Sequence, residues 1–222
     1  MSDKQENIGE KAARILVDIG AVNWNLETPF ILTSGAASPV YVDCRRLISY
    51  VRERREIVRM LAEKVKTDIG LKNIEIIAGG ETAGIPLAAW LSEELSLPMV
   101  YVRKKTKGFG KNKLIEGVME RGQKVLLLED LATTAKSKLS FCEALREAGA
   151  EVSHTLVIFE YGCYPDTDKE LESVSLTLHS LATWEILLQT AEKSGLIKKD
   201  ESESIRDFLS DPVSWSKKHG GA

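Results

Sequence analysis

Residues 124–139 read KVLLLEDLATTAKSKL, and the prediction of the fold begins from them. An apolar run from Val125 ends in two adjacent acids, Glu129 and Asp130, called here the acid pair; a polar turn then leads into an amphipathic helix that opens at Ser137. A continuous apolar run is typical of a central parallel strand that is buried on both faces. Ligands of open α/β sheets bind outside the carboxyl ends of such strands. The stretch therefore predicts an α/β fold with a candidate ligand site at the acid pair.

The polar turn after the acid pair, residues 132–136, has the chemistry of an anion site. Its residues before Lys136 are small or hydroxyl-bearing, and it runs into a helix N-terminus, where backbone N–H groups attract anions. Paired acids suit sugar hydroxyls, so the ligand implied is a phosphorylated sugar. The alternative is an ordinary strand-to-helix turn with solvated acids, because the same order of features occurs in other doubly wound folds.

Length and composition indicate a globular protein with one core and a small appended subdomain. The chain has 222 residues and a net charge of −3, which argues against a dedicated nucleic-acid binder. Its 3 cysteines form no CxxC pair, so neither a disulfide framework nor a zinc site is indicated. The N-terminus has no apolar signal region, and no apolar run approaches the ~20 residues that span a membrane. We expect a cytoplasmic protein with no membrane partner.

The segment ahead of the core predicts a helix and a hairpin. Apolar residues recur at helical spacing from Ile8 to Ile19, and Gly20 ends that helix. Residues 29–47, PFILTSGAASPVYVDCRRL, are called here the hood. Strand-like pieces at 30–33 and 40–43 flank SGAASP, which predicts a hairpin between them.

Strands then alternate with helices along the chain, which predicts a mainly parallel central sheet flanked by helices, with right-handed crossovers. We expect strands at 74–78, 99–102, 125–129, 151–159 and 174–178. We expect helices at 52–66, 87–95, 137–148 and 182–193, and a last helix near 205–209 that Asp211 and Pro212 terminate.

Two more strand ends carry candidate ligand groups. The glycine turn, residues 79–86, reads GGETAGIP; it lets backbone amides approach a ligand, although tight packing explains its glycines equally well. It is neither a GxGxxG nor a Walker A sequence. The basic loop, residues 103–113, reads RKKTKGFGKNK and contains no acid. It is either a solvated charged loop or a lid that closes over a polyanion.

Together these strand ends suit one ligand with a sugar between two phosphate groups. Breaking a glycosyl–pyrophosphate bond builds negative charge on the leaving group and positive charge on the sugar. Cations at the first and carboxylates near the second lower the barrier. A divalent ion held largely by the ligand's own oxygens is the expected helper, and Mg²⁺ suits it best.

The acid pair with its polar turn resembles the phosphoribosyl pyrophosphate (PRPP) signature of type I phosphoribosyltransferases. SGAASPVYVDCRRLIS, AGGETAGIP, RKKTKGFG and the acid-pair loop occur in that order over about residues 10–190 and look like the bacterial, orotate-specific members. The resemblance implies transfer of the phosphoribosyl group from PRPP to orotate in pyrimidine synthesis, with Mg²⁺. It also implies a homodimer that shares the basic loop between subunits. We expect a single domain, 1–222, with a helix and hood at about 10–50, a core at 51–190 and a C-terminal helical extension at 191–222.

The resemblance assigns roles by position. The catalytic residues would be Lys107, Asp130 and Glu129. PRPP would be bound by Arg103, Lys104, Lys107, Phe109, Thr82, Ala83, Glu129, Asp130, Leu131, Ala132, Thr133, Thr134, Ala135, Lys136 and Ser137. Within that set, residues 133–137 form the phosphate loop that would hold the 5′-phosphate. Orotate would be bound by Thr133, Thr33, Ser34, Gly35, Tyr41, Val42 and Tyr161. No residue is expected to ligate the metal directly.

The sequence departs from the family at several of these positions. Many members carry Lys at Thr33 and His at Phe109, and the phosphate loop often has glycines at Ala135 and Lys136. An orotate-contacting Arg of many members has no counterpart near Tyr161. Two alternatives therefore stay open. One is a phosphoribosyltransferase for another base, such as a purine, which the orotate-type hood disfavours. The other is a non-enzymatic regulator, which Lys107 with the acid pair disfavours.

Overall fold

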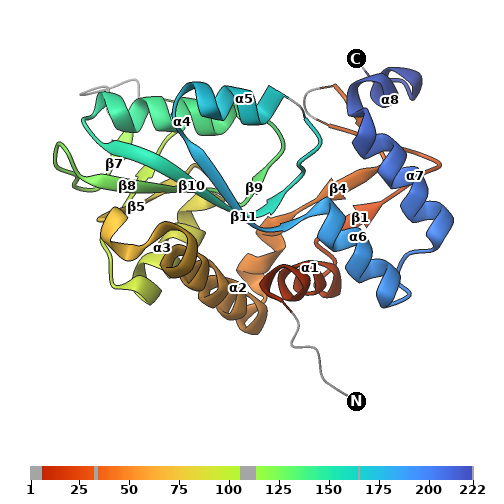
Figure 1. Cartoon of the computed structure of the whole chain (residues 1–222), viewed down its shortest axis with the longest axis horizontal. Coiled ribbons are helices and arrows are strands. Elements are labelled where there is room, and N and C mark those ends of the chain that lie inside the picture. The colour runs from red at the N-terminus through yellow and green to blue at the C-terminus, as the bar shows by residue number, and fades with distance from the viewer. Residues whose placement is uncertain (1–6, 33–34, 106–113, 165, 222) are drawn as a thin grey trace.

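The computed structural model describes residues 7–32, 35–105, 114–164 and 166–221, and its centre is a seven-stranded sheet (Figure 1). The strand order is β11-β10-β8-β5-β6-β7, with β9 beside β10. All pairs are parallel except β6 with β7, so the predicted mainly parallel sheet is confirmed. The bounds are β5 Ile76–Gly80, β6 Met99–Val102, β7 Ile115–Glu116, β8 Lys124–Leu128, β9 Leu131–Ala132, β10 Glu151–Glu160 and β11 Thr177–Thr183.

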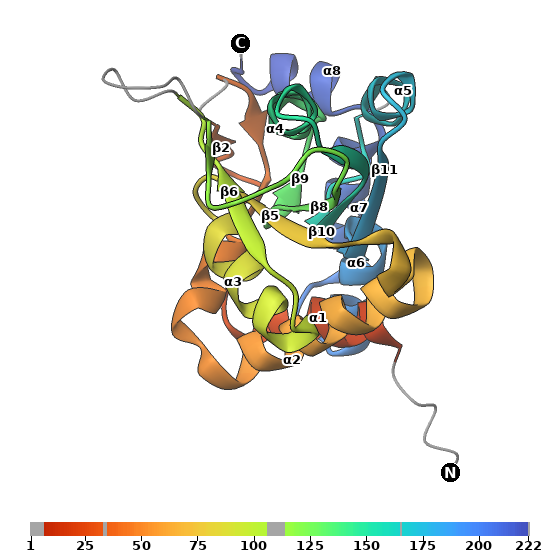
Figure 2. The same cartoon turned by 90° about the vertical axis from the view of Figure 1, so that its left-hand side faces the viewer.

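Helices cover both faces of this sheet. Figures 1 and 2 show α4 and α5 over one face and α1, α2 and α3 over the other. The bounds are α1 Ile8–Asp18, α2 Val51–Lys64, α3 Gly84–Leu95, α4 Lys136–Glu147, α5 Asp166–Ser173 and α6 Trp184–Lys193. The buried apolar side chains form two clusters, and strand β8 contributes to both. Leu126 and Leu128 pack in one cluster, and Val125 and Leu127 pack in the other. The apolar run after Lys124 is therefore buried on both faces, as its pattern predicts.

The hood pairs differently from the prediction. Strand β2 (Phe30–Ile31) pairs with β3 (Ala37–Ser38), and β4 (Val40–Val42) pairs with β1 (Val22–Trp24). The predicted hairpin between 30–33 and 40–43 is therefore wrong. The prediction missed β1 because three residues are too few to show a strand period. A short 3-10 helix, η1 (Cys44–Ser49), then leads from the hood to α2.

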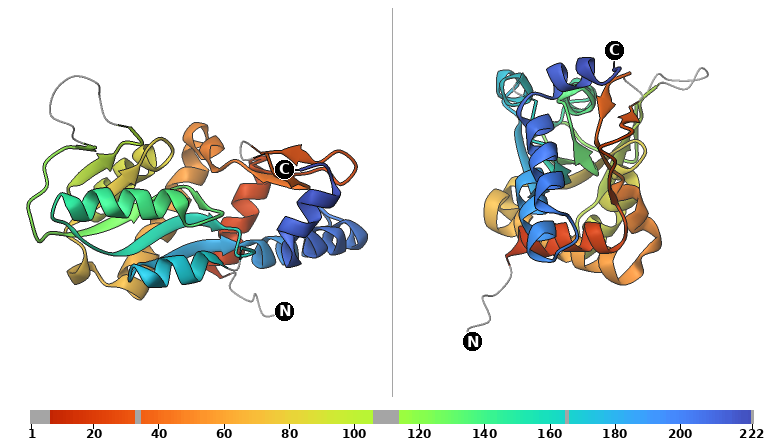
Figure 3. Two further views of the ribbon diagram at one scale, coloured as in Figure 1. Left: turned by 90° about the horizontal axis from the view of Figure 1, so that it is seen from above. Right: turned by 90° about the vertical axis from the view of Figure 1, so that its right-hand side faces the viewer.

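The chain ends in two helices rather than one, α7 (Lys199–Ser210) and α8 (Pro212–Lys218). The predicted end of the helix at Asp211 and Pro212 is confirmed, since α7 ends at Ser210, but the expectation that this is the last helix is wrong. The same two residues start α8: the Ser214 amide donates to the Asp211 side chain at 3.0 Å, and Pro212 occupies the first helical position. A proline there costs no hydrogen bond, and its fixed φ suits a helix start. Figure 3 shows both helices beside the hood, and α8 packs on β3.

Other element boundaries differ by a few residues. Strand β5 begins two residues later than predicted, β11 three residues later, and α3 three residues earlier, at Gly84. Helix α5 was missed because its sequence, DTDKELES, is polar and buries only Thr167 and Leu171. No helix in the described ranges has both the length and the apolar character needed to span a membrane.

Candidate active site

Strands β6, β5, β8 and β10 lie side by side and parallel, so the segments that follow them meet at one edge of the sheet. The basic loop follows β6, the glycine turn follows β5, and the acid pair follows β8. The first two are joined directly, because the Lys104 amide donates to Glu81 Oε2 at 2.7 Å. The predicted convergence of the three motifs is therefore confirmed.

The two members of the acid pair have different surroundings. Glu129 is 8% exposed, and its Oε2 accepts hydrogen bonds from Ser137 Oγ at 3.1 Å and from Lys138 Nζ at 2.9 Å. Asp130 is half-buried, and its backbone carbonyl accepts from the Ile158 amide at 3.0 Å. Burial, and then the neighbouring Glu129, raise the pKa of the Asp130 carboxyl. Glu129 is thus fixed by its own ion pair.

The glycine turn brings α3 very close to the end of β8. A Cβ atom built on Gly84 would lie 2.3 Å from the Leu128 carbonyl oxygen, and one on Gly79 would lie 2.7 Å from the Gly84 carbonyl oxygen. Tight packing therefore requires these two glycines. Thr82 is exposed and Ala83 half-buried, and the peptide between Glu81 and Thr82 is cis.

In the phosphate loop, relatives often have glycine at the positions of Ala135 and Lys136, but neither residue here has a left-handed backbone conformation. Ala135 is buried and helical, with φ −73°, and α4 begins at Lys136, whose side chain is exposed. Among the described non-glycine residues, positive φ occurs only at Ser96 and Ser175. The departures at Ala135 and Lys136 therefore carry no backbone strain. Leu131, Thr133, Thr134 and Ser137 are half-buried, and Ala132 is buried.

The basic loop is only partly described. Arg103 is half-buried and forms an ion pair with Glu116 at 3.5 Å, whereas Lys104 and Lys105 are exposed. The candidate residues Lys107 and Phe109 lie outside the described residues, as do Lys111 and Lys113.

The candidate orotate residues of the hood lie on and around β4. Thr33 and Ser34 lie outside the described residues; Gly35 has a φ of 86°. Tyr41 is half-buried, and its hydroxyl accepts a hydrogen bond from Arg45 Nη2 at 3.0 Å. Val42 is buried.

Tyr161 joins the hood to the core. It is buried, and its ring packs edge-on against Phe159 and Trp184, with centroids 5.8 and 5.6 Å away. Its hydroxyl is hydrogen-bonded to the Val42 backbone, and burial raises its pKa. These contacts support a role for Tyr161 in holding β4 in place.

Sequence reasoning missed Arg45, which lies on η1. Its Nε donates to Asp43 Oδ1 at 2.5 Å, and its guanidinium interacts electrostatically with Asp130. The side chain is 56% exposed, so its remaining donors can reach a ligand. The signal was the alternation of Tyr41, Asp43 and Arg45 along the end of the hood, but only Tyr41 of these three was assigned to the site.

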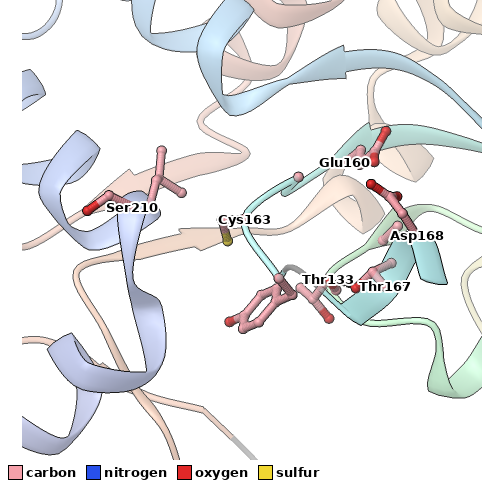
Figure 4. A pocket seen from close by; sticks show the side chains of 10 residues that line it. Thr133, Glu160, Cys163, Thr167, Asp168 and Ser210 are labelled. Carbon is pink, nitrogen blue, oxygen red and sulfur yellow. Dashed lines mark hydrogen bonds between the residues drawn. The ribbon is translucent and has the colours of Figure 1, made fainter. Parts of the chain in front are cut away.

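A cavity of about 290 Å³ adjoins the phosphate loop (Figure 4). It lies between the end of β10, the start of α5 and the end of α7. Its lining residues are Ala132, Thr133, Glu160, Gly162, Cys163, Tyr164, Thr167, Asp168, Leu209 and Ser210. Sequence reasoning missed it because α5 was not predicted and because its walls come from segments far apart in the chain. The C-terminal extension thus contributes a wall next to Thr133.

Comparisons with known proteins agree with this geometry. The family described as "Phosphoribosyl transferase domain" matches residues 50–189. An orotate phosphoribosyltransferase of Cereibacter sphaeroides is 49% identical over 211 residues, covering 95% of this chain and 91% of that protein. One from a Ruegeria species is 47% identical over 210 residues, covering 95% and 93%.

The chain belongs to the orotate phosphoribosyltransferase family. The crystal structure of an orotate phosphoribosyltransferase from Aeropyrum pernix has the same fold, with a TM-score of 0.67 and 32% identity, over 83% of this chain and 99% of that one. The resemblance that the motifs indicate is thus confirmed, together with the type I fold. Residues 191–221, which include α7 and α8, lie outside the matched family region.

Proposed function

We propose that this orotate phosphoribosyltransferase family member transfers the 5-phosphoribosyl group from PRPP to orotate, giving orotidine 5′-monophosphate and pyrophosphate in UMP biosynthesis. The observation that carries the proposal is the meeting of the acid pair, glycine turn and basic loop at one sheet edge, in a chain 49% identical to a curated member of the family.

Each part of the edge suits one part of PRPP. The N-terminus of α4 presents backbone amides to the 5′-phosphate, with Thr133 and Thr134 as hydroxyl donors. Ser137 belongs to the same loop, and its hydroxyl donates to Glu129. The Asp130 carboxylate binds ribose hydroxyls and stabilises positive charge that develops on the sugar. Thr82 and Ala83 line the turn at the pyrophosphate. Arg103, Lys104 and Lys107 balance the charge of the departing pyrophosphate, with Lys107 the main catalytic cation.

Mg²⁺ fits the residues at this edge as a ligand-held ion. Within the described ranges no group of three or more His, Cys, Asp or Glu side chains could hold a metal. Asp130 is half-buried, and burial raises its pKa, so a cation nearby would favour its ionised form. Pyrophosphate oxygens would supply most ligands of Mg²⁺. The ion would neutralise the leaving group's charge.

Orotate is an anion, so its recognition needs a positive group. Arg45 supplies one at the hood, since Asp43 and Tyr41 hold its guanidinium beside β4. Tyr41 and Val42, with Thr33, Ser34 and Gly35, cover the base, and Thr133 contacts it from the phosphate loop. Tyr161 acts through the Val42 backbone. Arg45 thus offsets the absence of the basic residues that many relatives carry at Thr33 and near Tyr161.

The proposal extends to the oligomeric state, the domain organisation and the cellular location of the protein. The protein is a homodimer in which the basic loop, residues 103–113, reaches the neighbouring subunit's site. It is one domain, with the divisions near residues 50 and 190 given above. A cytoplasmic location is supported by three free cysteines, Cys44, Cys142 and Cys163.

The reaction is tested by incubating the protein with PRPP, Mg²⁺ and one base at a time, and following the ultraviolet absorbance of the base. We expect orotate to be consumed, and uracil, hypoxanthine and guanine to be left unchanged. Turnover of a purine with orotate inert would instead favour the alternative phosphoribosyltransferase. Binding of PRPP without turnover of any base would favour the regulator.

A further inference from the structure

Resting on the proposed function, we propose that Lys138 is a positioning residue of the active site: its buried ammonium neutralises Glu129, so that Asp130 alone presents negative charge to the ribose and the metal. Of the charged side chains that the structure describes, only Glu129 and Lys138 are buried, and Lys138 is 1% exposed. The functional assignments above give Lys138 no role.

The contacts of Lys138 tie the acid pair to the phosphate loop. Its Nζ donates to Glu129 Oε2 at 2.9 Å and to the Leu131 carbonyl oxygen at 3.0 Å. Ser137, the preceding residue, donates to the same Glu129 oxygen at 3.1 Å. The first turn of α4 is thus hydrogen-bonded to Glu129 and to Leu131, the residues that precede and follow Asp130.

Packing alone does not account for a lysine at this place. A buried ammonium is costly to desolvate, and an apolar pair of similar volume is often at least as stable as a buried ion pair. A cation in the first turn of a helix also opposes the helix dipole. A buried charge here therefore indicates an electrostatic task, and the nearest candidate for it is the acid pair.

The task is the control of charge at Asp130. The groups that act on it are Glu129 beside it, Lys138 from α4, and Cys44 and Arg45 from η1. Burial and Glu129 raise the pKa of Asp130, and Lys138 lowers it. Without Lys138, the charge of Glu129 would act on Asp130 without compensation. Asp130 would then take up a proton at higher pH and lose its attraction for the sugar and Mg²⁺.

The test compares Lys138→Met with the wild type. The readout is the pH midpoint at which kcat/KM for PRPP falls on the acid side. We expect Lys138→Met to raise this midpoint by about one pH unit, because removing an opposite charge from an acid shifts its pKa by that order. The double variant Glu129→Gln/Lys138→Met should bring it back to the wild-type value or below. Lys72→Met, which removes an exposed lysine far along the chain from the site, is the matched control and should leave the midpoint unchanged.

Calorimetric binding of PRPP with Mg²⁺ over the same pH range follows the midpoint without any turnover, so it separates this inference from the identity of the base. If wild type binds PRPP but does not use orotate, the proposed reaction fails and the midpoint comparison still stands. A folded Lys138→Met protein with the wild-type midpoint in both measurements would show that Lys138 is only structural.

Lys138→Met can also fail to fold, and a second pair of variants covers that case. Glu129→Gln and Glu129→Gln/Lys138→Met both lack the Glu129 charge, and they differ only at residue 138. We expect the double variant to have the higher midpoint, since only the single variant keeps the cation near Asp130. Coincident midpoints would overturn the proposal.

Discussion

Asp130 and Glu129 are adjacent in sequence, yet their carboxyl groups have different surroundings in the protein. Glu129 is bound by Ser137 and Lys138, whereas burial and Glu129 raise the pKa of Asp130. A carboxylate that is costly to ionise in the empty site gains most when a cation or a developing positive charge arrives. The electrostatic cost of ionising Asp130 therefore serves ligand binding and catalysis rather than folding.

Replacing Asp130 by Asn tests that account through two measurements. Turnover should fall about 10³-fold, because a charge that stabilises the transition state is removed without a cavity. The stability of the ligand-free protein should be equal or higher at pH 7. Below the usual value of 3.8, Asp130 is protonated in both the folded and unfolded chain; as pH rises through 3.8 and the raised folded pKa, the unfolded chain ionises first and the wild type loses stability. Asn avoids that loss.

Urea unfolding of the wild type and Asp130→Asn, at a series of pH values, measures the difference. It should vanish toward pH 3 and grow toward neutrality. Asp207→Asn, an exposed change on α7, is the control and should alter neither turnover nor this pH dependence. Near-normal kinetics for Asp130→Asn would return the acid pair to an ordinary solvated turn.

Arg45→Gln tests the cation of the hood. We expect KM for orotate to rise about tenfold with a smaller change in KM for PRPP, because one charge-assisted hydrogen bond to the anionic base is lost. Arg46→Gln is the neighbouring control, since Arg46 bonds to the Ile19 carbonyl and to Tyr50 instead. An unchanged KM for orotate would exclude Arg45 from base recognition.

At the level of elements, the sequence predicted those whose signal is local. The run after Lys124 gave β8, and the order of its neighbours placed the candidate site at the correct edge. The pairing of β1 with β4 was missed, because it joins segments separated by another hairpin. Lys138 looked like one more polar residue of a helix, since its partner Glu129 is reached only once α4 has folded back onto β8. Long-range contacts of this kind leave no periodic trace.

The contact between the C-terminal extension and the hood is also long-range, and the sequence did not predict it. The Ala37 amide of β3 donates to Ser216 Oγ of α8 at 2.9 Å, in a buried contact. Ser216→Ala would leave that donor unpaired, at a local cost of about 1–3 kcal/mol. Faster hydrogen exchange at Ala37 and a several-fold higher KM for orotate should follow, because β3 belongs to the hood. Ser204→Ala, on the exposed side of α7, should change neither; equal exchange at Ala37 in both variants would mean that α8 does not hold the hood.

At the scale of the whole molecule, the proposed homodimer has each active site shared between two copies. In the described part of the basic loop, Arg103 is half-buried, whereas Lys104 and Lys105 are exposed, and the Lys104 amide donates to Glu81. The basic residues that follow would reach beyond their own subunit if the proposed dimer is correct. Sharing of this kind predicts that neither the basic loop nor the acid pair of one chain suffices.

Mixed dimers of Lys107→Ala and Asp130→Ala test that sharing. Each variant alone should be inactive, and the two are unfolded and refolded together. If the basic loop acts across the interface, one site of each mixed dimer combines an intact Asp130 from one chain with an intact Lys107 from the other, while its twin lacks both. Random pairing makes half of the dimers mixed, so roughly one quarter of wild-type activity should return. If the loop acts within its own chain, every site lacks one residue, and the mixture stays inactive although mixed dimers are shown to be present.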